Sequence, residues 1–151
     1  MLHFFLIIVY TYIGRDILKN KILIIVHVGL LFWFFLDMVG VSIFGQTLVE
    51  EAFKEDGVFF VIYAILVGLY FYKPKVGYAF LISWLIMWWI IQFVSHWYYT
   101  IFGSGEGRIM YFADTIKLIQ STNHYIPDLY HIVVHILILI AFICTIKFYS
   151  K

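Results

Sequence analysis

Hydrophobic residues fill most of this chain, in four long runs that short polar stretches separate. A helix needs about 20 apolar residues to cross roughly 30 Å of hydrocarbon, because each residue rises about 1.5 Å. The pattern predicts an all-α fold, a polytopic transmembrane helix bundle that forms one membrane-embedded domain over residues 1–151. Its four spans are predicted at residues 22–44, 58–72, 76–102 and 128–149, of which the second is short.

Two shorter segments accompany these spans. Residues 2–13 are apolar but too short to cross comfortably, and they lack the basic region and cleavage site of a signal peptide. We expect them to be retained as a re-entrant or interfacial segment, or as the first half of a kinked span. In residues 109–120, isoleucine and phenylalanine recur at near-helical spacing. That spacing predicts a short amphipathic helix on the outer membrane surface.

Composition supports lipid as the surrounding solvent. Of the 151 residues, 64% are hydrophobic and 13% are charged, whereas a soluble domain carries roughly 25% charged residues. A soluble domain of this size still exposes about a third of its unfolded surface to solvent. So many apolar side chains could not all be buried, and we expect the outer ones to contact lipid. The net charge of +1, without a basic stripe, argues against nucleic acid. The single cysteine, Cys144, excludes a disulfide framework and a cysteine-based metal site.

Basic residues predict the orientation, since cytoplasmic loops carry an excess of lysine and arginine. With four crossings, one side of the membrane receives seven basic residues, namely Arg15, Lys19, Lys21, Lys73, Lys75, Lys147 and Lys151. The other side receives three, namely Lys54, Arg108 and Lys117. We therefore expect a multi-pass protein of the cell membrane with a cytoplasmic C-terminus.

Four ionisable side chains lie inside the predicted spans, namely Asp37, His96, His131 and His135. Their distances from the span ends put them about 6 to 12 Å below the predicted outer surface. A central aspartate costs at least about 2.5–3.5 kcal/mol in a bilayer helix, so such residues usually face the bundle interior and mark function. The sequence thus predicts one functional layer built from three helices.

Helical periodicity puts these residues on polar stripes. Asp128, His131 and His135 follow an i, i+3, i+7 pattern, and His96 shares a helix face with glutamine, serine and threonine. Imidazole and carboxylate groups in one layer suit zinc or another divalent transition metal, such as iron or manganese. We predict metal ligation by His96, His131 and His135, with Asp37 or Asp128 completing the shell or acting as general base. Alternatively, the stripes only hydrogen-bond across helices and Asp128 is only a cap.

Two short motifs surround the histidines of the third and fourth spans. The first is Ser95-His96-Trp97-Tyr98-Tyr99-Thr100, and the second is Pro127-Asp128-Leu129-Tyr130-His131. They resemble Ser-His-Phe-x-x-Asp and Asp-Gln-x-x-His in an uncharacterised bacterial multi-span membrane family, one of the domain-of-unknown-function groups. Here threonine replaces the first acid, and the second acid is displaced by one position. The resemblance implies that His96 and His131 carry the shared chemistry, while the missing acid puts that chemistry in doubt.

The leading hypothesis is a membrane-embedded, metal-dependent hydrolase that acts on a lipid or other apolar substrate near the outer leaflet. A metal ion lowers the pKa of its bound water to about 7, so hydroxide is available at neutral pH. The His131-xxx-His135 spacing with an intramembrane aspartate is also similar to that of seven-span metal-dependent lipid amidases. Four spans differ from that architecture.

Three other classes fit the same sequence. A channel, pore or transporter component would use the polar face of the third span, and so few helices would then require a homo-oligomer. A b-type haem between His27 or His96 and a fourth-span histidine, coupled to quinone, would make a redox protein. The last class is an accessory subunit of a larger membrane complex. His27 alone is better explained as a hydrogen-bonded bundle residue than as a ligand.

Overall fold

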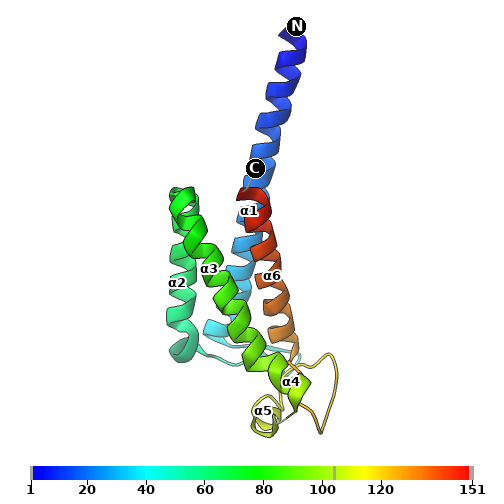
Figure 1. The fold of residues 1–151 in the computed structure, drawn as a ribbon. Coiled ribbons are helices and arrows are strands. Elements are labelled where there is room, and N and C mark those ends of the chain that lie inside the picture. The colour runs from blue at the N-terminus through cyan, green and yellow to red at the C-terminus, as the bar shows by residue number, and fades with distance from the viewer. Residues whose placement is uncertain (1, 104, 150–151) are drawn as a thin grey trace.

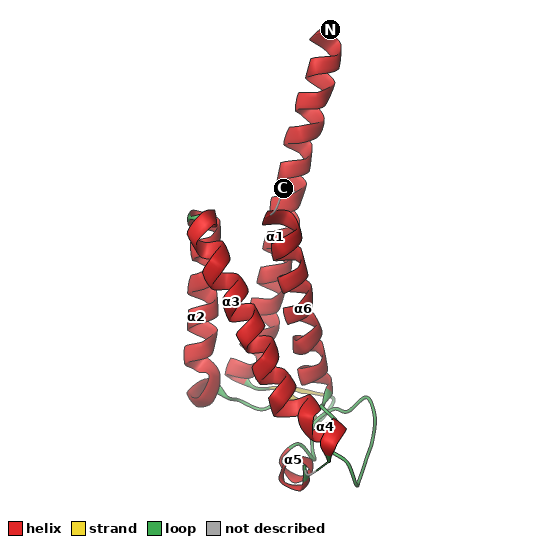
Figure 2. Cartoon of the chain, in the orientation of Figure 1, coloured by secondary structure: helices red, strands yellow, loops and turns green. Residues whose placement is uncertain are grey.

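The computed structural model describes the backbone of residues 2–103 and 105–149, with side chains from residue 20 onward. The helices are α1 (Leu2–Val39), α2 (Phe53–Tyr72), α3 (Pro74–Gln92), α4 (Tyr98–Phe102), α5 (Glu106–Tyr111) and α6 (Leu129–Tyr149). A π-helical turn, Phe93–Trp97, joins α3 to α4. The short strands β1 (Val41–Ile43) and β2 (Gln46–Val49) form an antiparallel hairpin after α1, in an otherwise helical chain (Figure 2).

Four helical stretches are long and apolar enough to cross a membrane, and they lie close to the predicted spans. They are Asn20–Val39, Phe53–Tyr72, Pro74–Phe102 and Leu129–Tyr149. Their helices form a closed ring in which α1 and α3 each pack against both α2 and α6 (Figure 1). The predicted helical bundle of four spans is therefore confirmed.

A buried polar network ties three of these helices together in the bundle interior. The His27 ring on α1 lies 2.8 Å from the Tyr63 hydroxyl on α2 through Nδ1, and 3.0 Å from Thr145 Oγ1 on α6 through Nε2. All three side chains are fully buried. Both ring nitrogens of His27 are thereby engaged, which confirms the prediction of a hydrogen-bonded bundle residue.

The tightest helix contact joins α2 to α3 near the Lys73 turn that connects them. Pro74 opens α3, where its missing N–H is tolerated because the first turn has no partner for it. Gly77 follows, and a Cβ there would overlap the backbone of Leu69 and Tyr70. The two helices can approach this closely only because residue 77 lacks a side chain.

The first span differs from its predicted bounds at both ends. Residues 2–13 form the first part of the continuous helix α1, so of the predicted alternatives the first half of a span fits, and a separate re-entrant or interfacial segment does not. At about 1.5 Å per residue α1 is roughly 57 Å long, and its first half extends beyond the other helices (Figure 1). The helix also ends before residue 44, because Gly40 (φ +66°) turns the chain into the hairpin. Phe44 and Gly45 both have positive φ, as a two-residue type I′ turn requires.

The helix predicted for residues 109–120 is also placed differently. The observed helix α5 ends at Tyr111, and after a short turn the chain bonds to the hairpin. The Ile116 N–H donates to the Thr47 carbonyl at 2.9 Å, and the Ile116 carbonyl accepts from Leu129 N–H at 2.8 Å. The helical spacing of apolar side chains therefore predicted the wrong structure here, because long-range backbone bonds hold residues 115–116 against the hairpin and α6.

Polar connections gather at one end of the bundle. The hairpin, α5 and residues 112–127 lie at this end, which we call the hairpin end (Figure 1). The α2–α3 turn with Lys73 and Lys75 lies at the opposite end, together with the last turn of α6. This arrangement fits an even number of crossings; the cytoplasmic placement of the C-terminus stays a prediction. Lys151 and the side chains of Arg15 and Lys19 lie outside the described residues.

Candidate functional site

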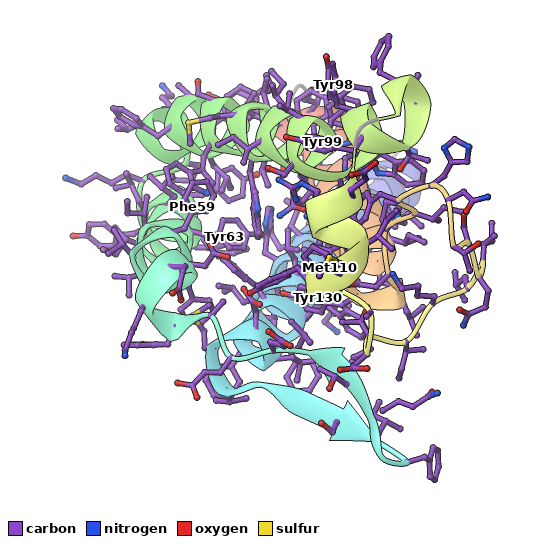
Figure 3. All side chains as sticks on the ribbon, turned by 90° about the horizontal axis from the view of Figure 1, so that it is seen from below. Phe59, Tyr63, Tyr98, Tyr99, Met110 and Tyr130 are labelled. Carbon is purple, nitrogen blue, oxygen red and sulfur yellow. The ribbon has the colours of Figure 1, made fainter. Side chains whose placement is uncertain are left out.

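A cavity of about 330 Å³ lies at the hairpin end, and we call it the polar chamber. Its walls come from the ends of all four spanning helices, from the hairpin and from the segment around α5. Viewed from this end, α5 with Met110 lies across the helix ends, and Tyr130 lies between the helices (Figure 3). The chamber therefore lies where the apolar bundle meets its polar connections.

Asp128 and His131 form a hydrogen-bonded pair at the start of α6. Asp128 Oδ1 accepts from the His131 backbone N–H at 2.9 Å and lies 2.7 Å from Nδ1 of the same residue. The carboxylate is thus the N-cap of α6 and also fixes the orientation of the imidazole. Asp128 is almost fully buried, and both Asp128 and His131 line the chamber. The sequence left two alternatives for Asp128, a helix cap and a functional acid. Its carboxylate caps α6 and also contacts the His131 ring, so the two roles are compatible.

His96 is held by Tyr125 in a matching way. It lies in the π-helical turn Phe93–Trp97, a distortion that is frequent at functional sites because it redirects side chains. Its Nδ1 lies 2.5 Å from the Tyr125 hydroxyl, which comes from the loop before α6. Burial, together with the nearby Asp128 carboxylate, raises the pKa of Tyr125 well above its usual value. The hydroxyl therefore keeps its proton and is available as a hydrogen-bond donor.

The imidazoles of His96 and His131 stack on each other. Their ring centroids are 3.9 Å apart with an angle of 30° between the planes, and the edge of Phe112 packs on the His131 ring. Each ring already uses Nδ1, for Tyr125 or for Asp128. Among the described residues no hydrogen bond occupies either Nε2 atom, so both remain for a ligand in the chamber.

Carboxylates dominate the rest of the chamber. Its lining includes six of them, namely Asp37, Glu50, Glu51, Glu55, Asp56 and Asp128. The Asp37 and Asp56 side chains are hydrogen-bonded to each other, for which one of them must carry the proton, and the Ala52 N–H donates to the Asp37 carbonyl at 2.8 Å, which joins the end of α1 to the start of α2. Arg108 is the one lysine or arginine among the described lining residues, and its guanidinium lies 4.5 Å from the centre of the Tyr99 ring.

The structure brings together most of the predicted site residues, with one exception. Asp37, His96, Asp128 and His131 all line the chamber. His135 instead packs with its ring 5.0 Å from that of Trp89, and it is absent from the described lining. Across residues 20–103 and 105–149, no group of three or more histidine, cysteine, aspartate or glutamate side chains could hold a metal ion. The predicted three-histidine set is therefore not assembled, and a bound transition metal stays a prediction.

Sequence reasoning missed two contributors to the chamber. The predicted second span began at residue 58, which left Asp56 outside it. Helix α2 begins earlier, at Phe53, so its first turn carries Asp56 into the chamber. The signal was present, since acids are favoured in the first turn of a helix and Asp56 directly precedes the apolar run. Tyr125 had no such local signal, because its partner is 29 residues away.

Comparisons with protein-family models, with curated proteins and with solved structures find no match to this chain. The resemblance carried by the two motifs stays a prediction. The function must therefore be argued from the geometry of the chamber.

Proposed function

We propose that this protein is a membrane-embedded hydrolase that cleaves an amphiphilic substrate by general acid–base catalysis in the polar chamber. One observation carries the proposal, namely that His131 and His96 stack while their Nδ1 atoms have opposite kinds of partner. The Asp128 carboxylate only accepts a hydrogen bond, whereas the Tyr125 hydroxyl can donate one, and we assign it that role toward His96. On this assignment the two imidazoles are opposite tautomers.

His131 is the general base. Because Asp128 accepts from its Nδ1–H, the lone pair of Nε2 is free to remove a proton from water. The buried carboxylate also stabilises the imidazolium that this transfer creates, as in the Ser-His-Asp arrangement. Water deprotonated at this position becomes the nucleophile.

His96 is the hydrogen-bond donor. With Tyr125 donating to Nδ1, Nε2 of His96 carries the hydrogen and can donate it to a ligand in the chamber. This N–H stabilises negative charge on the oxygen of the attacked group. The imidazolium of His131 then gives the proton that it took from water to the leaving group, which returns both rings to their starting state.

The position of the chamber favours an amphiphile as substrate. Four apolar helices end around it, so the chain of a lipid can remain in the bilayer while its polar bond reaches the imidazoles. The chamber opens at the end that carries Lys54, Arg108 and Lys117, which the charge pattern predicts to be the outer face. The proposed reaction therefore takes place at the outer leaflet.

A metal centre on the three histidines does not fit this geometry, because His135 packs against Trp89 and Trp97. We therefore assign the activation of water to His131 itself. The proposal needs His131 on α6, its N-cap Asp128, His96 in the π-helical turn and Tyr125 in the loop before α6.

The proposal is tested by turnover in proteoliposomes that contain the full chain. Amphiphiles with a carboxylic ester, an amide or a phosphodiester bond are supplied, and products are measured by mass spectrometry. His131→Ala is expected to lower the rate about 10²- to 10⁴-fold, the usual contribution of a general base. Asp128→Asn is expected to lower it about as much, because the amide can hold the wrong tautomer.

His124→Ala is the matched control, because His124 is an exposed loop histidine, and it is expected to keep the wild-type rate. If wild type cleaves none of the three bond types, the proposal fails. It also fails if His131→Ala turns over as fast as His124→Ala.

A further inference from the structure

A smaller cavity of about 60 Å³ opens behind the polar chamber, and we call it the recess. Each of the four spanning helices supplies at least one polar side chain to it: Asp37 from α1, Asp56 from α2, Gln92 from α3, and Tyr130 and His131 from α6. Aromatic and aliphatic side chains, including Trp88, close the remaining walls. The recess therefore adjoins the chamber: Asp37, Asp56 and Gln92 line both cavities, and Tyr130 lines the recess alone.

Two of those oxygen atoms lack a hydrogen-bond partner. The Tyr130 hydroxyl is unpaired although its residue is only 2% exposed, and Gln92 Oε1 is also buried and unpaired. A buried polar atom without a partner costs about 1–3 kcal/mol, so each such atom in a native protein needs an explanation. Trp33 does not supply one, because its indole donates to the Tyr130 backbone carbonyl instead.

The recess contains two acidic side chains without a matching lysine or arginine. Asp37 and Asp56 face each other there closely enough to share a proton, and among the described lining residues none is a lysine or an arginine. His131 is the one group in the lining that can become cationic, and its Nδ1 is committed to Asp128. Two carboxyl groups and two unpaired oxygens thus face a small space with no built-in positive partner.

We propose that the recess binds a calcium-sized divalent cation through the oxygens of Asp37, Asp56, Gln92 and Tyr130. Calcium takes six to eight oxygen ligands in a flexible geometry, and carboxylates bind it through one or both oxygens. Two bidentate carboxylates with one amide oxygen and one hydroxyl oxygen would reach the lower end of that range. A volume of about 60 Å³ holds an ion with one water molecule, since a water occupies about 30 Å³.

This site differs from the metal centre expected from the sequence. Its donors are hard oxygen atoms, whereas His96, His131 and His135 would select a transition metal. Only two of its four donors are acidic side chains, so it is not a cluster of three or more histidine, cysteine, aspartate or glutamate ligands. The inference goes beyond the proposed hydrolase activity, because cation binding is measured without any substrate.

Terbium luminescence tests the site directly in the full chain in detergent micelles. Terbium(III) replaces calcium at oxygen sites, and Trp88 in the wall of the recess can transfer excitation energy to it. We expect saturable emission that calcium displaces. Asp56→Asn should weaken terbium binding at least tenfold. Asp114→Asn makes the same chemical change at an exposed position outside the chamber and should bind as wild type does.

Tyr130→Phe provides a second variant that removes only the unpaired hydroxyl and keeps the buried ring. We expect severalfold weaker binding with an unchanged helical circular-dichroism spectrum, so this variant decides the matter if Asp56→Asn does not fold. Absence of saturable emission from wild type would mean that the recess holds only water and would overturn the inference. The same follows if Glu51→Gln, at the chamber mouth, weakens binding while Asp56→Asn and Tyr130→Phe do not.

Discussion

At the scale of single residues, partners decide what each histidine can do. His27 has both ring nitrogens bonded inside the bundle, so it ties helices together. His96 and His131 each keep Nε2 for the chamber, with Tyr125 and Asp128 on the other nitrogen. His27 and His131 thus differ in role although both lie in apolar helices, because the groups around the ring differ.

Tyr125→Phe tests whether Tyr125 acts as a positioning residue for His96. Loss of the hydroxyl leaves Nδ1 of His96 without its donor, so the ring can adopt the other tautomer. We expect kcat to fall about 10²-fold, the low end of the loss of one oxyanion donor, with KM nearly unchanged. Tyr98→Phe, at an exposed tyrosine of α4, is the control. Equal kcat values for the two variants would show that the Tyr125 hydroxyl has no such role.

At the scale of elements, close backbone packing and one irregular turn position the site. The π-helical turn at Phe93–Trp97 interrupts an otherwise continuous third span where His96 enters the chamber. The tight α2–α3 contact at Gly77 fixes the two helices that carry Asp56 and His96. The spanning helices and the π-helical turn thus carry Asp37, Asp56, His96 and His131, while the hairpin, α5 and the loops supply the rest of the described chamber lining.

Gly77→Ala tests the importance of the α2–α3 contact. The added methyl group would overlap backbone atoms of α2, which cannot move as a side chain can, so the helices must separate. We expect a destabilisation of about 1–3 kcal/mol or more, measured by denaturant titration in mixed micelles. Gly68→Ala is the matched control, because nothing lies within 4 Å of a Cβ at that helical position. Similar unfolding midpoints for both variants would contradict the described contact.

The spanning helices could be predicted from the sequence, but their connections could not. Long apolar runs are a local property that bilayer thickness demands, so α2, α3 and α6 lie near their predicted bounds. The hairpin and the extended segment at Ile116 depend on each other's backbone hydrogen bonds. Such bonds join distant parts of the chain and leave no periodic pattern, which is why residues 109–120 were predicted as a helix.

At the scale of the whole molecule, polar and apolar side chains occupy different parts of the bundle. Lipid-compatible side chains cover the helices, and a single network around His27 crosses their interior. Ionisable groups gather at the hairpin end, where all four helices meet the connections. This distribution suits a protein whose chemistry takes place at a membrane surface.

The site could be predicted only in part for a related reason. Asp37, His96 and His131 could be predicted from their positions inside predicted spans. An ionisable group in lipid is energetically costly, so it usually has a functional role. Depth and helical stripe also selected His135, yet its rotation on α6 turns it toward Trp89. Asp56 joins the chamber, and Tyr125 reaches His96, through tertiary contacts. Counting depth along a predicted span does not reveal such contacts.

The central claim is that His131 and His96 are opposite tautomers, one a base and the other a donor. Nitrogen-15 NMR of the full chain with labelled histidine, in lipid bilayers at neutral pH, measures this directly. Single His131→Gln and His96→Gln variants assign the signals. We predict that His131 carries its hydrogen on Nδ1 and His96 carries its hydrogen on Nε2. Finding both rings in the same tautomer, or both doubly protonated, would contradict the account.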